Sequence, residues 1–523
     1  MTLPGNHRVW AIGLLLIAIG CAKPGVRTND VKGGDGILRL SLSGEPRSLN
    51  PNVAPIDEYA YIVGQNIFSR LVSQADDGTI LPDLAERWSQ SADGLSYTFH
   101  LRGDVRFHDG TPLTVEDVRA TFARIGESAN SELGRHIAGV EAGQDRSIVL
   151  HLKAPWAAFI PALGWYGASI LPAHVYGNRP WAGNPANMRP IGSGPFRFKS
   201  WEPGRRIVLE KNPAFFGQGP YVDQLDYVIA TTQAEAEQLL LAGSVDVMIG
   251  RPRAGQVRQL AHSPGLRVSL SPSDSRTYLA FNMRRAPFAD LRLRRAVNIA
   301  LDRRAIVDKA LSGFGTPAVG FYTPAVAWAY NGNARVPPHD VAFARKLVGD
   351  AGPVPRIVFA FPDTATATPV GTEIMRQLEL VGFRVDPRPF APQEYLARIT
   401  TDHSFDLLVL SGSQGPDPDA MAARFGSGGS MQIMGYSNPN LDAVLARGGM
   451  ISDPTSRAAA YYRAQDILAV DLPIAPLYET MRVAVFREGI RGLPHEDASG
   501  LVPDYTFNLV RLRAANADPA RKP

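Results

Sequence analysis

The residue types that most often carry out chemistry are dispersed along this chain of 523 residues. It contains no Walker A loop, no His-Glu-x-x-His helix and no Gly-x-Ser-x-Gly elbow. His100, His108 and Asp109 come closest to a metal site, but His100 falls on the polar face of a predicted strand and His108 in a predicted turn. Because these residues lack regular ligand spacing, they do not favour metal binding. The sequence therefore predicts no catalytic residue, no metal and no cofactor.

Two carboxylates in one loop are better placed to bind a ligand. Asp417 and Asp419 belong to the segment Ser411–Asp419, which follows a predicted buried strand over Asp406–Leu410. Asp417 is a candidate for holding a positively charged group of a solute. Asp419 is a candidate too, but we favour it as the N-cap of a helix that begins near Ala420.

The elements around this loop predict where it lies. Strands and helices alternate in this part of the chain, which argues for a mainly parallel sheet covered by helices. Ligands of such sheets bind beyond the carboxyl ends of the strands, so we expect the loop to face a ligand. The expected strands are 357–361, 383–385 and 406–410, and the expected helices are 370–381, 393–399 and 459–470.

The stretch Leu81–Ile125 has the clearest local pattern. Apolar and polar side chains alternate from Leu95 to Leu101, as in a half-buried strand. Val105 and Phe107 are expected to start a short return strand. Thr114 and Asp117 then form the capping-box pattern at the start of a helix. The pattern predicts a strand, a turn, a strand and a capped helix, with no chemistry of its own.

This stretch also resembles a known family. The residues "LAERW", which begin at Leu84, and "DGLSYTFHLRGDVRFHDGTPLTVEDV", which end at Val118, are similar to the core motif of the extracellular solute-binding proteins of family 5. Gly192-Ser193-Gly194-Pro195 resembles the family's Gly-Thr-Gly-Pro. The resemblance extends from about Ile37 to Val510. These proteins are the peptide- and nickel-type binding components of bacterial ABC importers.

The resemblance implies a fold. We expect an α/β, two-lobed periplasmic-binding-protein fold with mixed sheets flanked by helices, an extra subdomain in lobe one and a hinge between the lobes. The family places strands crossing between its lobes at Tyr278–Met283 and near Tyr478–Phe486. The expected divisions are a lipoprotein signal peptide at 1–21, a flexible tether at 22–36, lobe I at 37–70, an inserted subdomain at 71–189, more of lobe I at 190–284, lobe II at 285–484, and a return to lobe I with the tail at 485–523.

The resemblance also implies a function. Such proteins close two lobes over a solute and deliver it to the permease subunits of an ABC transporter. In peptide-binding relatives an Asp in the loop after the late strand meets the amino group, but here that position falls near Ser413 or Gln414. Asp417 and Asp419 are possible substitutes. The candidate ligand-binding residues are Glu45, Arg47, Tyr278, Asn282, Tyr322, Gln414, Asp417 and Tyr436.

The N-terminus predicts export. His7 and Arg8 precede an apolar run over 9–20, which is shorter than the roughly 20 residues that span a bilayer and has the length of a signal-peptide core. Ala18-Ile19-Gly20-Cys21 resembles a lipobox, although Ala18 replaces the usual Leu. We expect Cys21, the only cysteine, to be lipidated and to anchor the chain in the cell envelope or periplasm.

Composition is consistent with this interpretation. The chain has 54 basic and 50 acidic residues, a net charge of +4, so no nucleic-acid partner is indicated. The resemblance implies a monomer that captures peptides or a similar polar solute. Alternatives are a binding protein for a sugar, a metal chelate or a modified peptide, a secreted hydrolase assembled from distant residues, and an interaction module that binds nothing small.

Overall fold

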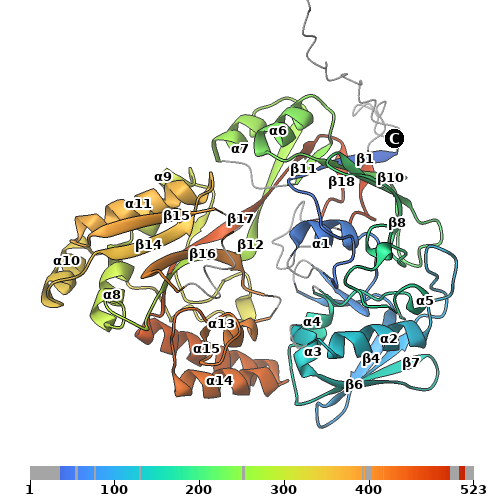
Figure 1. The fold of residues 1–523 in the computed structure, drawn as a ribbon, viewed down its shortest axis with the longest axis horizontal. Coiled ribbons are helices and arrows are strands. Elements are labelled where there is room, and N and C mark those ends of the chain that lie inside the picture. The colour runs from blue at the N-terminus through green and yellow to red at the C-terminus, as the bar shows by residue number, and fades with distance from the viewer. Residues whose placement is uncertain are drawn as a thin grey trace, which may run out of the picture.

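The computed structural model describes residues 36–512, apart from 54–56, 76–77, 129–130, 166, 178, 250–253, 392–393, 395–402, 416 and 495–505. The expected signal peptide with Cys21, and most of the helix expected over 393–399, lie outside these residues. The described chain forms two lobes (Figure 1). None of its described helices has both the length and the apolar character needed to cross a membrane.

One mixed sheet passes through both lobes, in the strand order β15-β14-β16-β12-β17-β11-β1-β10-β9-β8. Its two central strands, β12 (Leu266–Phe281) and β17 (Ile474–Arg487), are long and antiparallel. Their pairing runs from Leu266 opposite Arg487 to Ala280 opposite Ile474, with register shifts after Pro272 and after Thr277. These two strands cross from one lobe to the other (Figure 1).

Lobe I is built on one end of this sheet. β1 lies parallel to β10 and β11, and β8, β9 and β10 pair antiparallel. Phe507 and Val510 near the C-terminus are buried in the core of this lobe. The elements are β1 (Ile37–Leu42), α1 (Glu58–Gly64), α5 (Ala173–Tyr176), the 3-10 helix η1 (Pro185–Asn187), β8 (Phe196–Glu202), β9 (Arg206–Lys211), β10 (Gln224–Ile229), α6 (Gln233–Leu241), β11 (Val247–Ile249), α7 (Ala254–Ala261), β18 (Ile490–Arg491) and β19 (Arg511–Leu512).

A subdomain with its own sheet, in the order β4-β5-β7-β6, packs below lobe I in Figure 1. Its core contains the alternating side chains Tyr97, Phe99 and Leu101 of β5 together with Val118 and Phe122 of α2. The elements are β2 (Val72–Gln74), β3 (Ile80–Pro82), β4 (Ala85–Gln90), β5 (Ser96–Leu101), α2 (Val115–Gly126), α3 (Glu132–His136), β6 (Ile137–Ala142), β7 (Ser147–Leu152) and α4 (Phe159–Leu163).

The local prediction for this subdomain is partly correct. The strand over 96–101 and the helix after Thr114 are confirmed, and the capping box forms because the Thr114 N–H donates to Asp117 Oδ2 at 2.8 Å. The return strand expected at Val105 and Phe107 does not form. Only an isolated bridge joins Arg106 to Pro112, because β5 already pairs with β4 on one side and β7 on the other.

Lobe II is built on the other end of the shared sheet. The predicted parallel strands are confirmed, since β14 pairs parallel with both β15 and β16. The elements are α8 (Leu291–Ala300), α9 (Arg303–Ala310), β13 (Thr316–Pro317), the 3-10 helix η2 (Ala327–Ala329), α10 (Val341–Asp350), β14 (Ile357–Pro362), α11 (Ala367–Leu380), β15 (Val385–Phe390), β16 (Leu407–Ser413), α13 (Ala420–Phe425), α14 (Pro439–Met450) and α15 (Pro454–Asp471).

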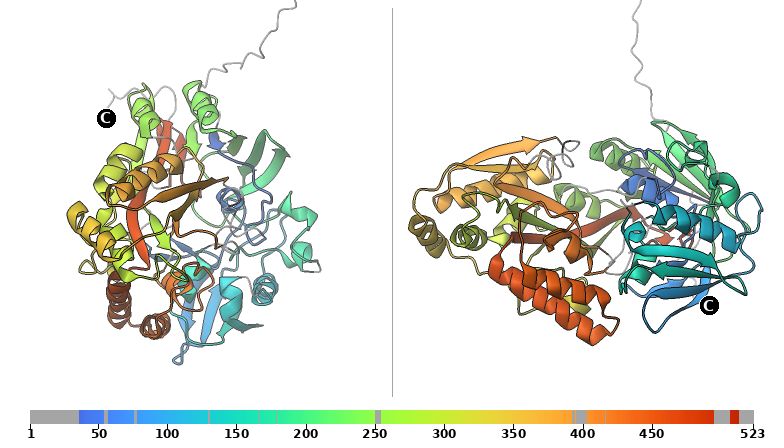
Figure 2. Two further views of the ribbon diagram at one scale, coloured as in Figure 1. Left: turned by 60° about the vertical axis from the view of Figure 1, so that its left-hand side comes forward. Right: turned by 60° about the horizontal axis from the view of Figure 1, so that its bottom comes forward.

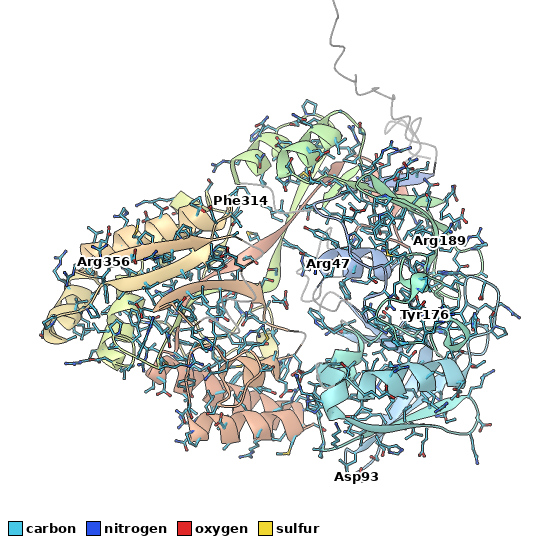
Figure 3. The ribbon with its side chains drawn as sticks, viewed as in Figure 1. Arg47, Asp93, Tyr176, Arg189, Phe314 and Arg356 are labelled. Carbon is cyan, nitrogen blue, oxygen red and sulfur yellow. The ribbon has the colours of Figure 1, made fainter. Side chains whose placement is uncertain are left out.

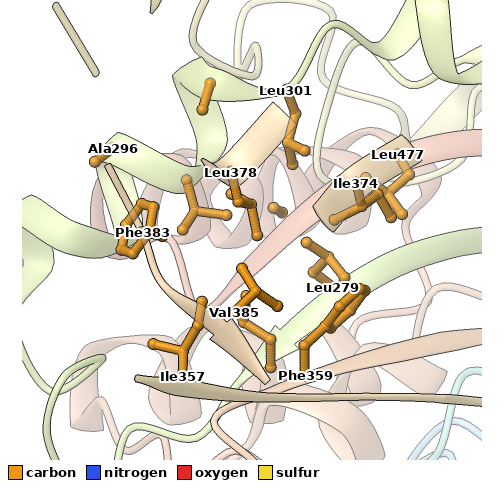
Figure 4. Packing of buried hydrophobic residues seen from close by; sticks show 14 of the residues in the cluster. Leu279, Ala296, Leu301, Ile357, Phe359, Ile374, Leu378, Phe383, Val385 and Leu477 are labelled. Atoms are coloured by element: carbon orange, nitrogen blue, oxygen red, sulfur yellow. The ribbon is translucent and has the colours of Figure 1, made fainter. Parts of the chain in front are cut away.

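The crossing strand β12 divides the interior of lobe II into two cores. Successive side chains of a strand point to opposite faces of the sheet. Leu279 and Phe281 therefore enter a core with helices α8 and α11, part of which is drawn in Figure 4. Tyr278 and Ala280 enter a second core with helices α14 and α15. The C-terminal end of β12 is therefore packed against a hydrophobic core on both faces of the sheet.

Candidate functional site between the two lobes

The carboxyl end of β16 is tied to the crossing strand β12. The Ser413 hydroxyl donates to a carboxylate oxygen of Asp274, and the Gln414 N–H donates to the Asp274 carbonyl at 3.0 Å. The guanidinium of Arg424, on α13, donates to the carbonyl of Gln414 at 3.1 Å and to that of Ser413. The loop after β16 thus starts from a polar junction with β12.

Asp274 was missed in the sequence. Its carboxylate is almost wholly buried, and Arg482 Nη2 lies 3.8 Å from Asp274 Oδ1. Burial raises the pKa of this carboxyl, while the Ser413 hydrogen bond and the nearby Arg482 and Arg424 act in the opposite direction. The one sequence signal was an acidic residue within an otherwise strand-like segment.

A buried ion pair joins the two crossing strands. Arg276 of β12 donates from Nε to Glu479 Oε1 of β17 at 3.1 Å, and from Nη2 to the Tyr322 carbonyl at 2.7 Å. Arg276 is 1% exposed and Glu479 6% exposed. Within the described part of the chain, Arg276 Nη1 has no hydrogen-bond partner.

Two predicted tyrosines lie near this ion pair. The ring of Tyr322 is fully buried, and its hydroxyl is unpartnered among the described residues. Burial raises the pKa of Tyr322, and the charges of Asp417 and Asp274 add to the effect. Tyr278 is buried as well, which raises its pKa, while Arg424 acts against the shift.

The acidic loop residues have separate partners. Asp417 forms a buried bidentate pair with Arg457 of α15, at 2.6 and 2.7 Å. Asp419 stands at the N-cap position of α13, as predicted, but its side chain makes no capping hydrogen bond. Its Oδ2 instead accepts from Trp156 Nε1 at 2.7 Å. Since Trp156 belongs to the core of the subdomain, this hydrogen bond links the two lobes.

A second hydrogen bond lies beside the first. The Ala157 N–H donates to the Gly449 carbonyl of α14 at 2.7 Å. Figures 1 and 2 show α3 and α4 of the subdomain meeting α13 and α14 of lobe II here, away from the crossing strands. Among the described residues, the lobes therefore meet at β12 and β17, at this contact, and where Arg258 Nη1 of α7 donates to the Ser312 carbonyl after α9 at 3.1 Å.

The two predicted residues of lobe I, Glu45 and Arg47, lie in the loop after β1. The exposed Glu45 accepts from Trp201 Nε1 at 2.8 Å and from the Gly204 N–H at 2.9 Å, which ties the loop to the β8–β9 hairpin. The backbone N–H of Arg47 donates to Asp57 Oδ2 at 3.0 Å. The Arg47 side chain is exposed beside α1, facing lobe II (Figure 3).

Asn282, Tyr436 and Gln414 already have partners within lobe II. Asn282 Nδ2 donates to the carbonyls of His403 and Phe405, at 3.1 and 2.9 Å. The Tyr436 hydroxyl donates to Asp471 Oδ2 at 2.6 Å. Gln414 Nε2 donates to the Gly412 carbonyl at 3.1 Å. These contacts give each side chain a role in holding lobe II together.

Two histidines, one in the subdomain and one in α5, join the subdomain to lobe I. His108 Nδ1 accepts from the Gly192 N–H at 3.2 Å, and Nε2 lies 3.1 Å from the Gly194 carbonyl, to which it donates. Burial lowers the pKa of His108 to about 4. His174 pairs instead with Asp109. Among the described residues, no group of three His, Cys, Asp or Glu side chains is arranged to hold a metal.

The two glycines of the segment Gly192-Ser193-Gly194-Pro195 face the backbone of Ile67. Neither takes the left-handed backbone conformation that favours glycine. A Cβ on Gly192 would lie 2.0 Å from the Ile67 carbonyl oxygen, and one on Gly194 would lie 2.7 Å from the Ile67 carbonyl carbon. Glycine is required here because two backbone segments approach closely.

Comparison with known proteins identifies the class. Residues 79–432 match the family model of the bacterial extracellular solute-binding proteins, family 5, and the chain belongs to this family. It is 28% identical to the probable di/tripeptide-binding protein 5 of Pseudomonas aeruginosa UCBPP-PA14, over 82% of this chain and 87% of that protein.

Two solved structures share the fold at 25% identity. The oligopeptide-binding protein AppA of Bacillus subtilis, in complex with a nonapeptide, matches with a TM-score of 0.78 over 91% of this chain and 98% of that one. The binding protein AgaA of A. tumefaciens R10, in complex with agropinic acid, matches with a TM-score of 0.77 over 91% and 99%. The predicted family, two-lobed α/β fold and solute-binding class are therefore confirmed. Such proteins capture solutes outside the cytoplasmic membrane for ABC importers rather than transforming them.

Proposed function

We propose that this protein captures peptides, or a similar polar solute, between its two lobes and delivers them to the permease subunits of an ABC transporter. The observation that carries the proposal is the double connection of the lobes, through β12 and β17 and again through Trp156 and Asp419. A solute held between these connections contacts both lobes only when they are closed, and so shifts the population toward the closed form. The di/tripeptide-binding relative and the nonapeptide complex of AppA support peptides as the ligand class.

Arg47 is our candidate for the carboxylate end of the solute. Its backbone is fixed by Asp57, whereas its guanidinium is exposed and forms no ion pair with the described residues. A guanidinium binds a carboxylate through two parallel hydrogen bonds. Glu45 positions this loop through Trp201 and Gly204.

The end of β16 is our candidate for the opposite end of the solute. Ser413 and the Asp274 carboxylate that it contacts lie here, and an amino group would find a negative charge in this place. The Tyr322 hydroxyl and Arg276 Nη1, which lack partners in the described chain, add a donor-acceptor group and a donor. Tyr278 and Asp417 line the same region, whereas Gln414, Asn282 and Tyr436 support it through their contacts within lobe II.

A non-peptide solute is the second candidate. Ser413 supplies a hydroxyl near the position at which peptide-binding relatives carry an acidic residue. Binding of a peptide's amino group would therefore depend on the carboxylate of Asp274. AgaA, with the same fold, was solved with agropinic acid.

Peptide binding is tested by calorimetry and thermal unfolding with Ala-Ala, Ala-Ala-Ala, the same peptides N-acetylated or C-amidated, and agropinic acid. A ligand at 100 times its Kd stabilises a folded protein by about 2.7 kcal/mol. We expect the free peptides to raise the melting temperature. A response to agropinic acid alone would assign the second candidate, and no response to any of these peptides would refute peptide capture.

The Arg47→Met variant tests the carboxylate assignment. Since hydrogen bonds to charged groups contribute about 1.5–3 kcal/mol, we expect free-carboxylate peptides to bind about tenfold or more weakly. The amidated peptides should bind both proteins equally. The matched control is Arg356→Met, which removes an exposed cation at the far end of lobe II (Figure 3). Equal loss for free and amidated peptides would contradict the assignment.

The remaining proposals concern the cell envelope. We propose that Cys21 is lipidated and that the mature chain acts as a monomer tethered to the membrane. The mass of the mature chain from a bacterial membrane fraction tests this, since a diacylglyceryl-modified Cys21 should form its N-terminus. An unmodified N-terminus at or after residue 22 would contradict lipidation.

A further inference from the structure

Two hydrogen bonds join the subdomain to lobe II. Trp156 Nε1 donates to Asp419 Oδ2, and the Ala157 N–H donates to the Gly449 carbonyl, both at 2.7 Å. The first bond joins an indole to a carboxylate, and such charge-assisted hydrogen bonds are stronger than neutral ones. We call these four residues the closing contact.

The subdomain holds its half of the closing contact rigidly. The Trp156 side chain is 4% exposed and belongs to the subdomain core. The ring of His136, at the end of α3, stacks on the indole with centroids 3.9 Å apart and planes 10° apart. Phe159 packs against it at a centroid distance of 6.1 Å. The indole N–H is therefore aimed at lobe II before the contact forms.

Lobe II holds the other half in the same way. The Asp419 N–H donates to Asp417 Oδ1 at 2.9 Å, and Asp417 is fixed by its bidentate pair with Arg457. Arg457 Nε also donates to the Gly448 carbonyl at 3.1 Å. One arginine of α15 therefore positions both the carboxylate loop and the end of α14.

Gly449 is needed for the two bonds to lie side by side. A Cβ at this position would stand 2.8 Å from Asp419 Oδ1, which is closer than side-chain atoms approach one another. The residue lies within α14, with no positive φ angle, so alanine suits its backbone. A methyl group here would displace the Asp419 carboxylate while favouring the helix.

We propose that the closing contact holds the two lobes together in the absence of solute. The ligand-free protein then already populates the closed form, and a bound solute increases that population further. Each bond joins groups that water would otherwise satisfy when the lobes separate. The contact therefore acts on the equilibrium between open and closed forms and not on the folding of either lobe. This proposal goes beyond the proposed function and is independent of the solute class.

The test measures the distance between the lobes in the absence of solute. Spin labels are attached through Arg189→Cys in lobe I and Arg356→Cys in lobe II, both exposed, in a Cys21→Ser background (Figure 3). Unfolding and refolding in denaturant removes any co-purified solute. Pulsed electron paramagnetic resonance then gives the populations of short and long distances.

The variants are Trp156→Phe, which removes the indole donor, and Gly449→Ala. The matched control is Trp201→Phe, because Trp201 donates to Glu45 at 2.8 Å within lobe I. We expect the closed-to-open ratio to fall about tenfold in Trp156→Phe and Gly449→Ala, and to be unchanged in Trp201→Phe. Gly449→Ala should keep or raise its melting temperature, which separates opening from misfolding.

Two results would overturn the proposal. One is a ligand-free protein without a short-distance population. The other is a Trp156→Phe distance distribution that superposes on those of Trp201→Phe and the unsubstituted protein. Since no solute is present, neither result bears on whether peptides bind.

Discussion

Two of the contacts between the lobes, the crossing strands and the closing contact, are built in opposite ways. At the crossing strands, β12 and β17 pair along most of their length, and a buried arginine–carboxylate pair joins them. At the closing contact, two hydrogen bonds join side chains and backbone that are each fixed in their own lobe. The first connection cannot break without unfolding part of the shared sheet, whereas the second breaks when the lobes separate.

This difference indicates how the molecule can move. The register of β12 against β17 shifts twice between Pro272 and Tyr278, so the ladder of backbone bonds is interrupted at the boundary between the lobes. Interrupted pairing bends a strand and re-aims the residues beyond it. We expect the lobes to rotate about this segment, with the closing contact as the part that travels farthest.

The largest expected effect comes from breaking the ion pair at the crossing strands. Arg276→Met leaves the Glu479 carboxylate buried without its cation, and we expect a loss of about 3–5 kcal/mol in the free energy of unfolding. Chemical denaturation measures this loss. The exposed pair Arg388–Asp386 provides the control, where Arg388→Met should cost less than about 1 kcal/mol.

The double variant sharpens this test. Replacing both Arg276 and Glu479 by methionine removes both buried charges, so it should be less destabilising than Arg276→Met alone. A double variant that is as unstable as the sum of the two single variants would show that the pair does not act as a unit.

A smaller and pH-dependent effect is expected where the subdomain joins lobe I. Burial lowers the pKa of His108 to about 4 in the folded protein, from its ordinary value of 6.5. The unfolded chain therefore takes up a proton first as pH falls, and stability is lost between about pH 6.5 and pH 4. The free energy of unfolding lost over this pH range is about 3 kcal/mol, because one pKa unit corresponds to about 1.4 kcal/mol.

Comparison of His108→Gln with the unsubstituted protein isolates this contribution. Denaturation at a series of pH values should show a shallower loss of stability in the variant over that range. The control is His262→Gln. His262 is exposed and lies directly after α7, beside the Arg258 carbonyl, and its replacement should leave the pH dependence of stability unaltered. Parallel curves for His108→Gln and the unsubstituted protein would contradict the role of His108.

The smallest effect on stability is expected at the closing contact. Trp156→Phe should change the free energy of unfolding by only about 1 kcal/mol, because the open form restores water to Asp419. The contrast with Arg276→Met is the central difference between the two connections. A loss as large as that of Arg276→Met would show that the closing contact is part of the folded core.

The sequence predicted what depends on local patterns. Alternating side chains identified β5, the pair Thr114 and Asp117 identified the start of α2, and strand–helix alternation identified the parallel part of lobe II. The family resemblance supplied the arrangement of the lobes. These features depend on neighbours in the chain or on a long ordered motif.

The sequence did not predict what depends on distant partners. Asp419 was assigned to the helix that follows it, because its partner Trp156 is far away in the chain and in another lobe. Asp274 was missed because nothing local indicates its contact with Ser413. Gly192 was noted only as part of a family-like segment, although glycine is required there by the close approach of the Ile67 backbone. In each case the deciding atom belongs to a segment that only the fold brings near.

The most direct test of solute capture uses the same two spin labels, at residues 189 and 356, with and without Ala-Ala-Ala at a concentration that saturates binding by calorimetry. The account predicts that the peptide converts the long-distance population into the short one, and that Arg47→Met requires more peptide for the same conversion. A peptide that binds by calorimetry but leaves the distance distribution unchanged would contradict capture by closure of the two lobes.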